Sequence, residues 1–233
     1  MLTIYPAAER FSFDRGWLRG SHSFAFGEYQ DESNMAFGPM RVCNDDFIAP
    51  GRGFGAHPHS DMEIISIVLS GALRHEDSMG NVAVSTYGGI QRMSAGSGVI
   101  HTEHNASDEE EVNLLQLWFT PHTRGLKPSY EAITYDTDLL AGQLLPVVTP
   151  QGGEGQAFIH QDMTVYLSRL QSGETLHFTQ TAERKVFLFV IEGSLMVHGQ
   201  ELNTRDTARI EAEEQLGLTA GQPVFFMLVD LPE

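Results

Sequence analysis

Two short segments combine side chains that could hold a metal ion. His57-Pro58-His59 and His101-Thr102-Glu103 each follow a run that contains several glycines. In a β-strand alternate side chains point to the same face, so each segment directs two ligand-type groups to one side. Three imidazoles and one carboxylate converging inside a barrel would bind one divalent metal and leave coordination positions open for a substrate. The sequence therefore predicts a site for metal-assisted chemistry.

The rest of the chain reads mainly as β-strands that would position these segments. Runs rich in β-branched and aromatic residues, at 63–69, 113–119, 185–191 and 224–229, are separated by turn residues, and 23 Gly and 10 Pro punctuate the chain. This pattern is typical of antiparallel sandwiches and barrels, and convincing helical periodicity is scarce. We therefore expect an all-β protein with few, short helices.

A faint internal repeat indicates two barrels. Val68–Leu73 resembles Val190–Leu195, since both read as strand, glycine turn and strand. The intervening stretch 120–155 is rich in Pro, Gly and polar residues, which suits a linker. We expect a metal-binding N-terminal domain over 1–130 and a degenerate C-terminal domain over 131–233. In the second half His177-Phe178-Thr179 replaces the His-Pro-His pattern, so we expect a scaffold or lid there.

Composition limits the classes of function. A formal charge of −17 argues against direct nucleic-acid binding, which needs clustered Lys and Arg. Cys43 is the only cysteine, so no internal disulfide is available, and we expect it buried in a strand. The longest strongly apolar run, 187–191, is far shorter than the roughly 20 residues that span a membrane, and no signal peptide is visible. A soluble, cytoplasmic protein is the expectation.

The ligand segments resemble the two motifs of the cupins. They read Gly51-Arg-Gly-Phe-Gly-Ala-His57-Pro-His59-Ser-Asp-Met-Glu63 and Gly98-Val-Ile-His101-Thr-Glu103-His-Asn105. Two departures are that seven residues, instead of six, separate Glu63 from Gly71, and that Gly96 stands where the second motif commonly has Pro. The segments Gly-Phe-Gly-x-His-Pro-His and Gly-x-Gly-x-x-His-x-Glu, the second with Glu103 closely following His101, resemble the pirin family of two-barrel cupins. Further segments resemble its bacterial members across nearly the whole chain: Gly16-Trp-Leu18, Ser23-Phe24, Arg41–Asp46, His75–Asn81 and His160–Met163.

This resemblance implies two cupin (double-stranded β-helix) barrels, with a metal in the N-terminal barrel only. His57, His59, His101 and Glu103 match the family's four metal ligands. One divalent transition metal is expected, with Fe(II) favoured and Mn, Co, Ni, Cu or Zn as alternatives.

Other polar residues near these segments are not expected to be metal ligands. Glu63 lies on the same strand face as His59 but well along it, so we expect it at the rim or as a partner of a ligand. His104 should turn away from the metal by strand alternation. Asn105 could orient a ligand or stabilise a turn. His75 could line the mouth of the pocket, but a solvated hairpin turn is preferred. His22, His122 and His198 are expected to be structural or solvent-facing.

The resemblance also implies a reaction. Pirin-like proteins of this bacterial type are associated with quercetin 2,3-dioxygenase activity, in which O2 opens the heterocycle of a flavonol and carbon monoxide leaves. We expect a small, flavonol-like aromatic substrate, with Glu103 also serving as the base that accepts a hydroxyl proton. The alternatives are a redox-responsive protein that binds a regulatory or metabolic partner without turnover, and a metal-dependent isomerase. A monomer and a dimer both remain open.

Overall fold

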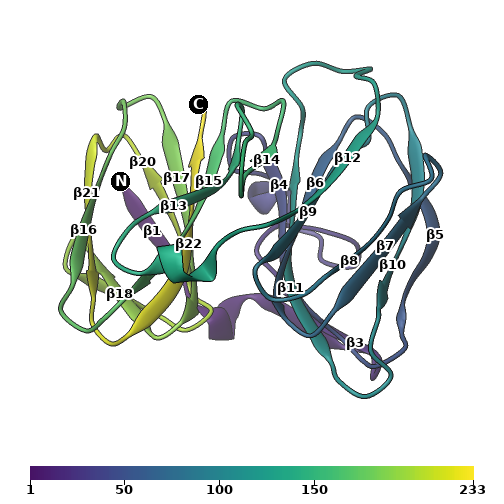
Figure 1. Cartoon of the computed structure of the whole chain (residues 1–233). Helices are drawn as coiled ribbons and strands as arrows, with labels where there is room; N and C mark the ends of the chain where they lie inside the picture. The colour runs from purple at the N-terminus through teal and green to yellow at the C-terminus, as the bar shows by residue number, and fades with distance from the viewer. The chain divides into compact units, whose positions relative to one another are not determined.

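The computed structural model describes all 233 residues and consists almost wholly of antiparallel β-strands (Figure 1). The helical segments are three short 3-10 turns: η1 (Ala7–Glu9), η2 (Glu32–Asn34) and η3 (Thr137–Leu140). The prediction of an all-β protein with few short helices is confirmed. None of the helical turns has the length and apolar character that crossing a membrane requires.

The chain forms two compact units, of which the N-terminal unit comprises Phe11–Tyr135 and Gln151–Gln161. Its larger sheet has the strand order β12-β9-β6-β11-β4-β3-β2, and a smaller sheet has the order β5-β10-β7-β8. Figure 1 shows these two sheets as facing layers. The strands are β2 (Phe11–Asp14), β3 (Leu18–His22), β4 (Met40–Ile48), β5 (Gly53–His59), β6 (Glu63–Ser70), β7 (Leu73–Asp77), β8 (Val82–Ser85), β9 (Gly89–Ser94), β10 (Val99–Asn105), β11 (Val112–Phe119), β12 (Ser129–Thr134) and β14 (Ala157–Phe158).

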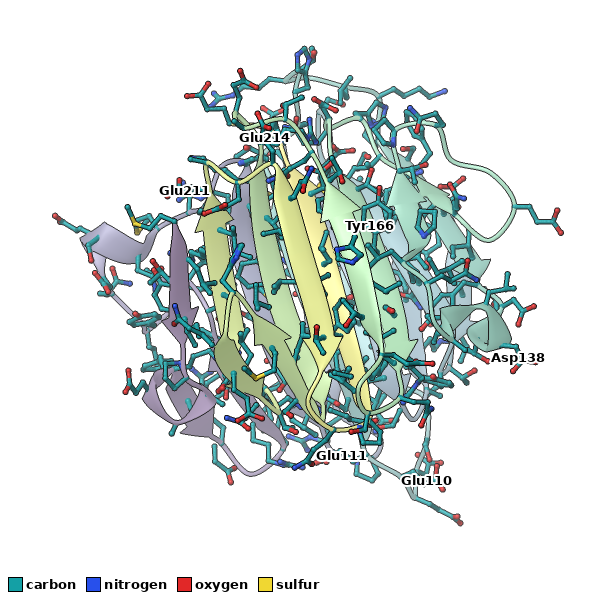
Figure 2. All side chains as sticks on the ribbon, turned by 90° about the vertical axis from the view of Figure 1, so that its left-hand side faces the viewer. Glu110, Glu111, Asp138, Tyr166, Glu211 and Glu214 are labelled. Atoms are coloured by element: carbon teal, nitrogen blue, oxygen red, sulfur yellow. The ribbon has the colours of Figure 1, made fainter.

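The C-terminal unit comprises Met1–Arg10, Asp136–Pro150 and Asp162–Glu233. Its larger sheet runs β1-β20-β17-β22-β15-β13, and Figure 2 shows β22 near its centre, with Tyr166 on the neighbouring β15. A second sheet has the order β16-β21-β18-β19. The strands are β1 (Leu2–Tyr5), β13 (Leu145–Thr149), β15 (Thr164–Leu170), β16 (Thr175–Thr179), β17 (Lys185–Glu192), β18 (Ser194–Val197), β19 (Gln200–Asn203), β20 (Thr207–Glu211), β21 (Gln215–Ala220) and β22 (Val224–Leu231).

The division between the units differs from a single cut at residue 130. Strand β1 pairs with β20, so backbone hydrogen bonds hold the first residues in the C-terminal unit. Strand β12 continues to Thr134 along β9, and Gln151–Gln161 returns to the N-terminal unit. Sequence composition marks where the chain is irregular, but strand pairing decides which unit each segment joins.

The interiors of the two units differ in chemistry. The space between the C-terminal sheets is filled by one large cluster of buried apolar side chains, against which Tyr166 packs. The N-terminal unit contains smaller apolar clusters, one that includes Leu18, Ile48 and Leu73 and another made of Ile64, Met93 and Val99. Polar side chains, including His101 and Glu103, are also buried in this unit. The N-terminal interior therefore has room for chemistry. Cys43 is fully buried on β4, as expected from the sequence.

Candidate metal centre and adjoining cavity

Pairing of β5 with β10 brings the two histidine segments together. The strands are antiparallel, with His101 opposite His57 and Val99 opposite His59. A register shift follows between His101 and Glu103, so Glu103 pairs with Phe54. The ring centroids of His57 and His59 are 4.8 Å apart, and those of His59 and His101 are 4.9 Å apart. One nitrogen from each of the three imidazoles lies within 4.8 Å of the other two.

The hydrogen bonds of these imidazoles suit a bound cation. Nδ1 of His57 lies 2.7 Å from the carbonyl oxygen of Gly55, which can only accept, so Nδ1 carries the proton and the lone pair is on Nε2. That Nε2 lies 3.0 Å from Nε2 of His101. Nε2 of His59 is buried and has no hydrogen-bond partner. A divalent metal would satisfy these nitrogens, so the residues fit the expected group.

Burial also keeps two of the imidazoles neutral. Burial, followed by the neighbouring imidazoles of His101 and His57, lowers the pKa of His59 to about 4. The same causes, with His57 and His75 as the neighbours, lower the pKa of His101 to about 3. Neutral imidazole is the form that binds metals. The site is therefore poised to bind a cation at neutral pH.

The fourth expected ligand, Glu103, lies beside His101 and has hydrogen bonds of its own. Its carboxylate is buried and accepts hydrogen bonds from Oγ of Ser66 (3.1 Å) and Nε2 of Gln116 (2.8 Å). Nε1 of Trp118 donates to Oε1 of Gln116 (3.1 Å), which turns the Gln116 amide nitrogen toward Glu103. In the structure Glu103 groups with His101 and His75, while His57, His59 and His101 form the other group. Both groups lie in the N-terminal unit.

The preference for His75 in a solvated turn is wrong. His75 is 2% exposed. Strand β7 lies between β10 and β8, and its buried residues Leu73 and His75 alternate with the exposed Arg74 and Glu76. Its ring stacks on Tyr130 at a centroid distance of 4.1 Å, and its Nδ1 lies 3.3 Å from Nδ1 of His101. The alternation of Leu73 and His75 with the charged residues Arg74 and Glu76 is the sequence signal that favours an inward His75. The turn residues that follow, Ser78–Asn81, obscure it.

Glu63 is neither at the rim nor bonded to a ligand. It is completely buried at the start of β6, and its carboxylate accepts hydrogen bonds from Ser94 Oγ (2.8 Å) and from the backbone N–H groups of His160 and Gln161 (both 3.0 Å). Its role is to hold the returning segment Gln151–Gln161 in the N-terminal unit. Sequence spacing could not reveal this, because the partners lie almost 100 residues away along the chain.

Two neighbours of Glu103 have structural positions. The burial of β10 alternates, which places His104 on the opposite face from His101 and Glu103, as expected. Asn105 donates to the carbonyl oxygens of Ile48 (2.9 Å) and Glu110 (2.7 Å) and accepts from Ser107 N–H (2.9 Å). Of its two proposed roles, the structure supports the turn.

A cavity of about 510 Å³ adjoins the histidines. His57, His59, Glu103 and Gln116 contribute polar groups to its lining. Its aromatic walls comprise Phe11, Phe13, Trp17, Phe26, Phe54 and Trp118. The volume and the largely apolar lining with a few convergent polar groups are typical of a small-molecule site. His22, expected to be structural or solvent-facing, is buried against three of these phenylalanines and also lines the cavity.

Asp46 is a lining residue that sequence reasoning missed. It is 5% exposed, and its Oδ1 has no hydrogen-bond partner. Burial, reinforced by the carboxylates of Asp45 and Glu103, raises the pKa of Asp46 to about 8. A β-carbon added at Gly20 on β3 would collide with Oδ1 of Asp46, so the glycine makes room for this carboxyl group. Asp46 therefore presents a neutral acid to the cavity at neutral pH.

Comparison with known proteins supports the resemblance seen in the motifs. The pirin family profile matches residues 6–119, and a profile described as the quercetinase C-terminal cupin domain matches residues 146–231. A protein named quercetin 2,3-dioxygenase from Escherichia coli K12 is 38% identical over 232 residues, which cover 100% of this chain and 99% of the relative. A pirin-like protein from Caulobacter vibrioides is 38% identical over 93% of this chain and 94% of its own length.

A solved structure extends the comparison to the fold. The crystal structure of a bacterial pirin from Escherichia coli in complex with nickel(II) superposes with a TM-score of 0.94. The two chains are 37% identical, and the match covers 100% of this chain and 99% of the other. The expectation of two cupin barrels is confirmed by the matched N-terminal and C-terminal profiles.

Proposed function

Since this chain belongs to the pirin family of two-barrel cupins, we propose that it is a metal-dependent dioxygenase that opens the heterocycle of quercetin or a related flavonol with O2 and releases carbon monoxide. One observation carries the proposal. Three imidazoles converge beside a cavity with aromatic walls, and the buried carboxylate of Glu103 lies next to one of them, His101.

The metal ligands in this proposal are His57, His59, His101 and Glu103. A nickel(II) complex of a relative supports a divalent transition metal, and we retain Fe(II) as the favoured ion. When bound, such a metal supplies Lewis-acid stabilisation of a deprotonated hydroxyl group and a centre for oxygen chemistry.

Glu103 is proposed to accept the proton of a substrate hydroxyl group. Ser66 and Gln116 each donate to a different carboxylate oxygen, so both oxygens are oriented and each retains lone-pair capacity for a further proton or cation. General-base catalysis of this kind contributes roughly 10²–10⁴-fold in rate.

The cavity walls are proposed to select a flat aromatic substrate. Phe54 and Trp118 contact the ligand histidines, with ring centroids 6.4 Å from His57 and 4.8 Å from His59 respectively. A planar polyphenol would bury its ring faces against such walls while its hydroxyl groups reach Glu103 and the neutral acid of Asp46.

The test is carbon monoxide release during aerobic incubation of the metal-reconstituted protein with quercetin. We expect release by the wild type and none by His59→Ala, with His177→Ala as the matched control because His177 lies on β16 of the C-terminal unit. Conversion without oxygen would indicate isomerisation instead. Absence of carbon monoxide with every candidate metal would contradict the flavonol reaction.

A further inference from the structure

A chain of hydrogen bonds leads from a turn to the proposed ligand His101. Asp77, at the end of β7, accepts at Oδ1 from the backbone N–H groups of Met79 (2.9 Å) and Asn81 (3.0 Å). Its Oδ2 lies 3.1 Å from Nε2 of His75 and accepts from the side-chain Nδ2 of Asn81 (2.9 Å), which also donates to Oδ1 (3.1 Å). Nδ1 of His75 lies 3.3 Å from Nδ1 of His101. The side chains of His75 and Asp77 are 2% and 0% exposed, so water does not replace these contacts.

The chemistry of each partner determines where the protons lie. A carboxylate only accepts, so Nε2 of His75 carries a proton, and in the neutral imidazole Nδ1 then carries the lone pair. That lone pair can accept only if Nδ1 of His101 carries the proton. The lone pair of His101 is then on Nε2, which faces Nε2 of His57 at 3.0 Å.

A second set of contacts directs His57 in the same way. The carbonyl oxygen of Gly55 requires a proton on Nδ1 of His57, which leaves the Nε2 lone pair of His57 facing that of His101. Two lone pairs at this distance repel unless a cation lies between them. The hydrogen bonds therefore favour the metal-binding forms of both imidazoles.

We propose that Asp77, acting through His75, is a positioning residue that selects the Nδ1-protonated tautomer of His101 and so presents its Nε2 to the metal. The proposal rests on His101 being a metal ligand, as proposed above. Partners beyond the ligands tune metal sites in many proteins, and their loss typically lowers metal affinity by roughly 10–100-fold.

Asp77→Asn should reverse the donor and acceptor roles along this series of hydrogen bonds, with little change in side-chain shape. The N–H groups of Met79 and Asn81 would bind the amide oxygen at the Oδ1 position, so the amide nitrogen would face His75. Because that nitrogen is a donor, His75 would accept at Nε2 and carry its proton on Nδ1. His101 would then accept at Nδ1, carry its proton on Nε2 and donate to His57, so no cation is needed between the two Nε2 atoms. The side-chain amide of Asn81 would lose its acceptor at the Oδ2 position and keep its bond to the amide oxygen.

The experiment measures Ni(II) affinity by calorimetry, together with thermal unfolding and histidine ¹⁵N spectra of the metal-free protein. For Asp77→Asn we expect a Kd for Ni(II) about 10–100-fold higher than that of the wild type. The melting temperature of the metal-free variant should stay close to the wild-type value, because the bond lost from Asn81 to the Oδ2 position is offset by the bond gained between His101 and His57. The spectra should move the His75 proton from Nε2 to Nδ1. A merely structural role would lower the melting temperature and leave the tautomer unchanged.

Two further variants complete the test. Glu76→Gln makes the same chemical change on the neighbouring residue, whose carboxylate pairs with Arg74 on the exposed face, and should bind Ni(II) like the wild type. His75→Phe keeps a ring against Tyr130 but removes the acceptor for His101, so it should also weaken binding. Wild-type affinity in both Asp77→Asn and His75→Phe would overturn the proposal. Failure of the wild type itself to bind Ni(II) would instead refute the metal site.

Discussion

At the scale of single residues, the candidate site depends on buried groups whose orientation is set by their neighbours. Trp118 donates to Gln116, and Gln116 in turn donates to Glu103. Since the amide oxygen is occupied by the indole, the amide nitrogen must face the carboxylate. Two residues of β11 thus orient Oε2 of the proposed base, while Ser66 of β6 orients Oε1.

Replacement of Gln116 tests this arrangement. Gln116→Met keeps the side-chain volume but removes the donor, so Glu103 loses one of its two orienting hydrogen bonds. We expect kcat/KM for quercetin and Ni(II) affinity to fall by about 10–100-fold. Gln91→Met is the matched control, because Gln91 is also buried but its amide donates to Leu73 O and Ser85 Oγ instead of to Glu103. Equal losses in the two variants would show that the effect is general destabilisation.

Asp46 should make the stability of the metal-free protein depend on pH. Its pKa is raised from 3.8 to about 8, so between these values the folded state holds a proton that the unfolded state releases. Stability contributed by this group therefore falls as pH rises from about 4 to about 8 and is constant above that. We expect the melting temperature of Asp46→Asn to rise relative to that of the wild type as pH increases from about 4 to about 8. A difference that is independent of pH would show that Asp46 is ionised in the folded protein.

At the scale of elements, the pairing of β5 with β10 sets the relative positions of the three histidines. Gly53 lies where the backbones approach closely: a β-carbon there would meet Glu103 O and lie 2.5 Å from His104 Cα. The register shift between His101 and Glu103 occurs at this place. A glycine within a strand commonly marks such an approach.

Gly53→Ala should therefore separate the strands. We expect a loss of roughly 1–3 kcal/mol in the free energy of unfolding, the usual cost of overpacking, with weaker Ni(II) binding. Gly55→Ala on the same strand is the matched control, since a β-carbon there meets nothing within 4 Å and the carbonyl that binds His57 is retained. Urea unfolding of both metal-free variants measures the difference. Similar stability of the two would mean that the strands adjust without cost.

At the scale of the whole molecule, the two units use one architecture for different purposes. The C-terminal interior is packed with apolar side chains, whereas the N-terminal interior holds histidines, carboxyl groups and a cavity. A barrel filled by side chains has stability but no space for a ligand.

We therefore expect one metal ion per chain. The two ligand groups in the N-terminal unit share His101, so they cannot fill independently. Elemental analysis after Ni(II) loading and removal of excess metal should give one equivalent for the wild type and for His177→Ala, and none for His59→Ala. Two equivalents in the wild type would show that His75 and Glu103 hold a second ion.

The sequence by itself determined the strand-rich architecture and the duplication. It also indicated that His57 shares a strand face with His59, and His101 with Glu103. These features follow from local rules: side chains alternate along a strand, and glycine and proline mark turns. The spacing of ligand-type residues carried most of the information about chemistry, and the comparisons agree with the family it indicated.

The tertiary structure alone decided the contacts between distant strands. It placed His75 beside His101 because β7 pairs with β10, and it buried Asp46 over Gly20 because β3 pairs with β4. It moved Glu63 away from the site by bonding it to Gln151–Gln161, and it assigned β1 to the C-terminal unit. Register between strands depends on the summed packing and hydrogen bonding of many residues, so no local pattern in the sequence specifies these neighbours.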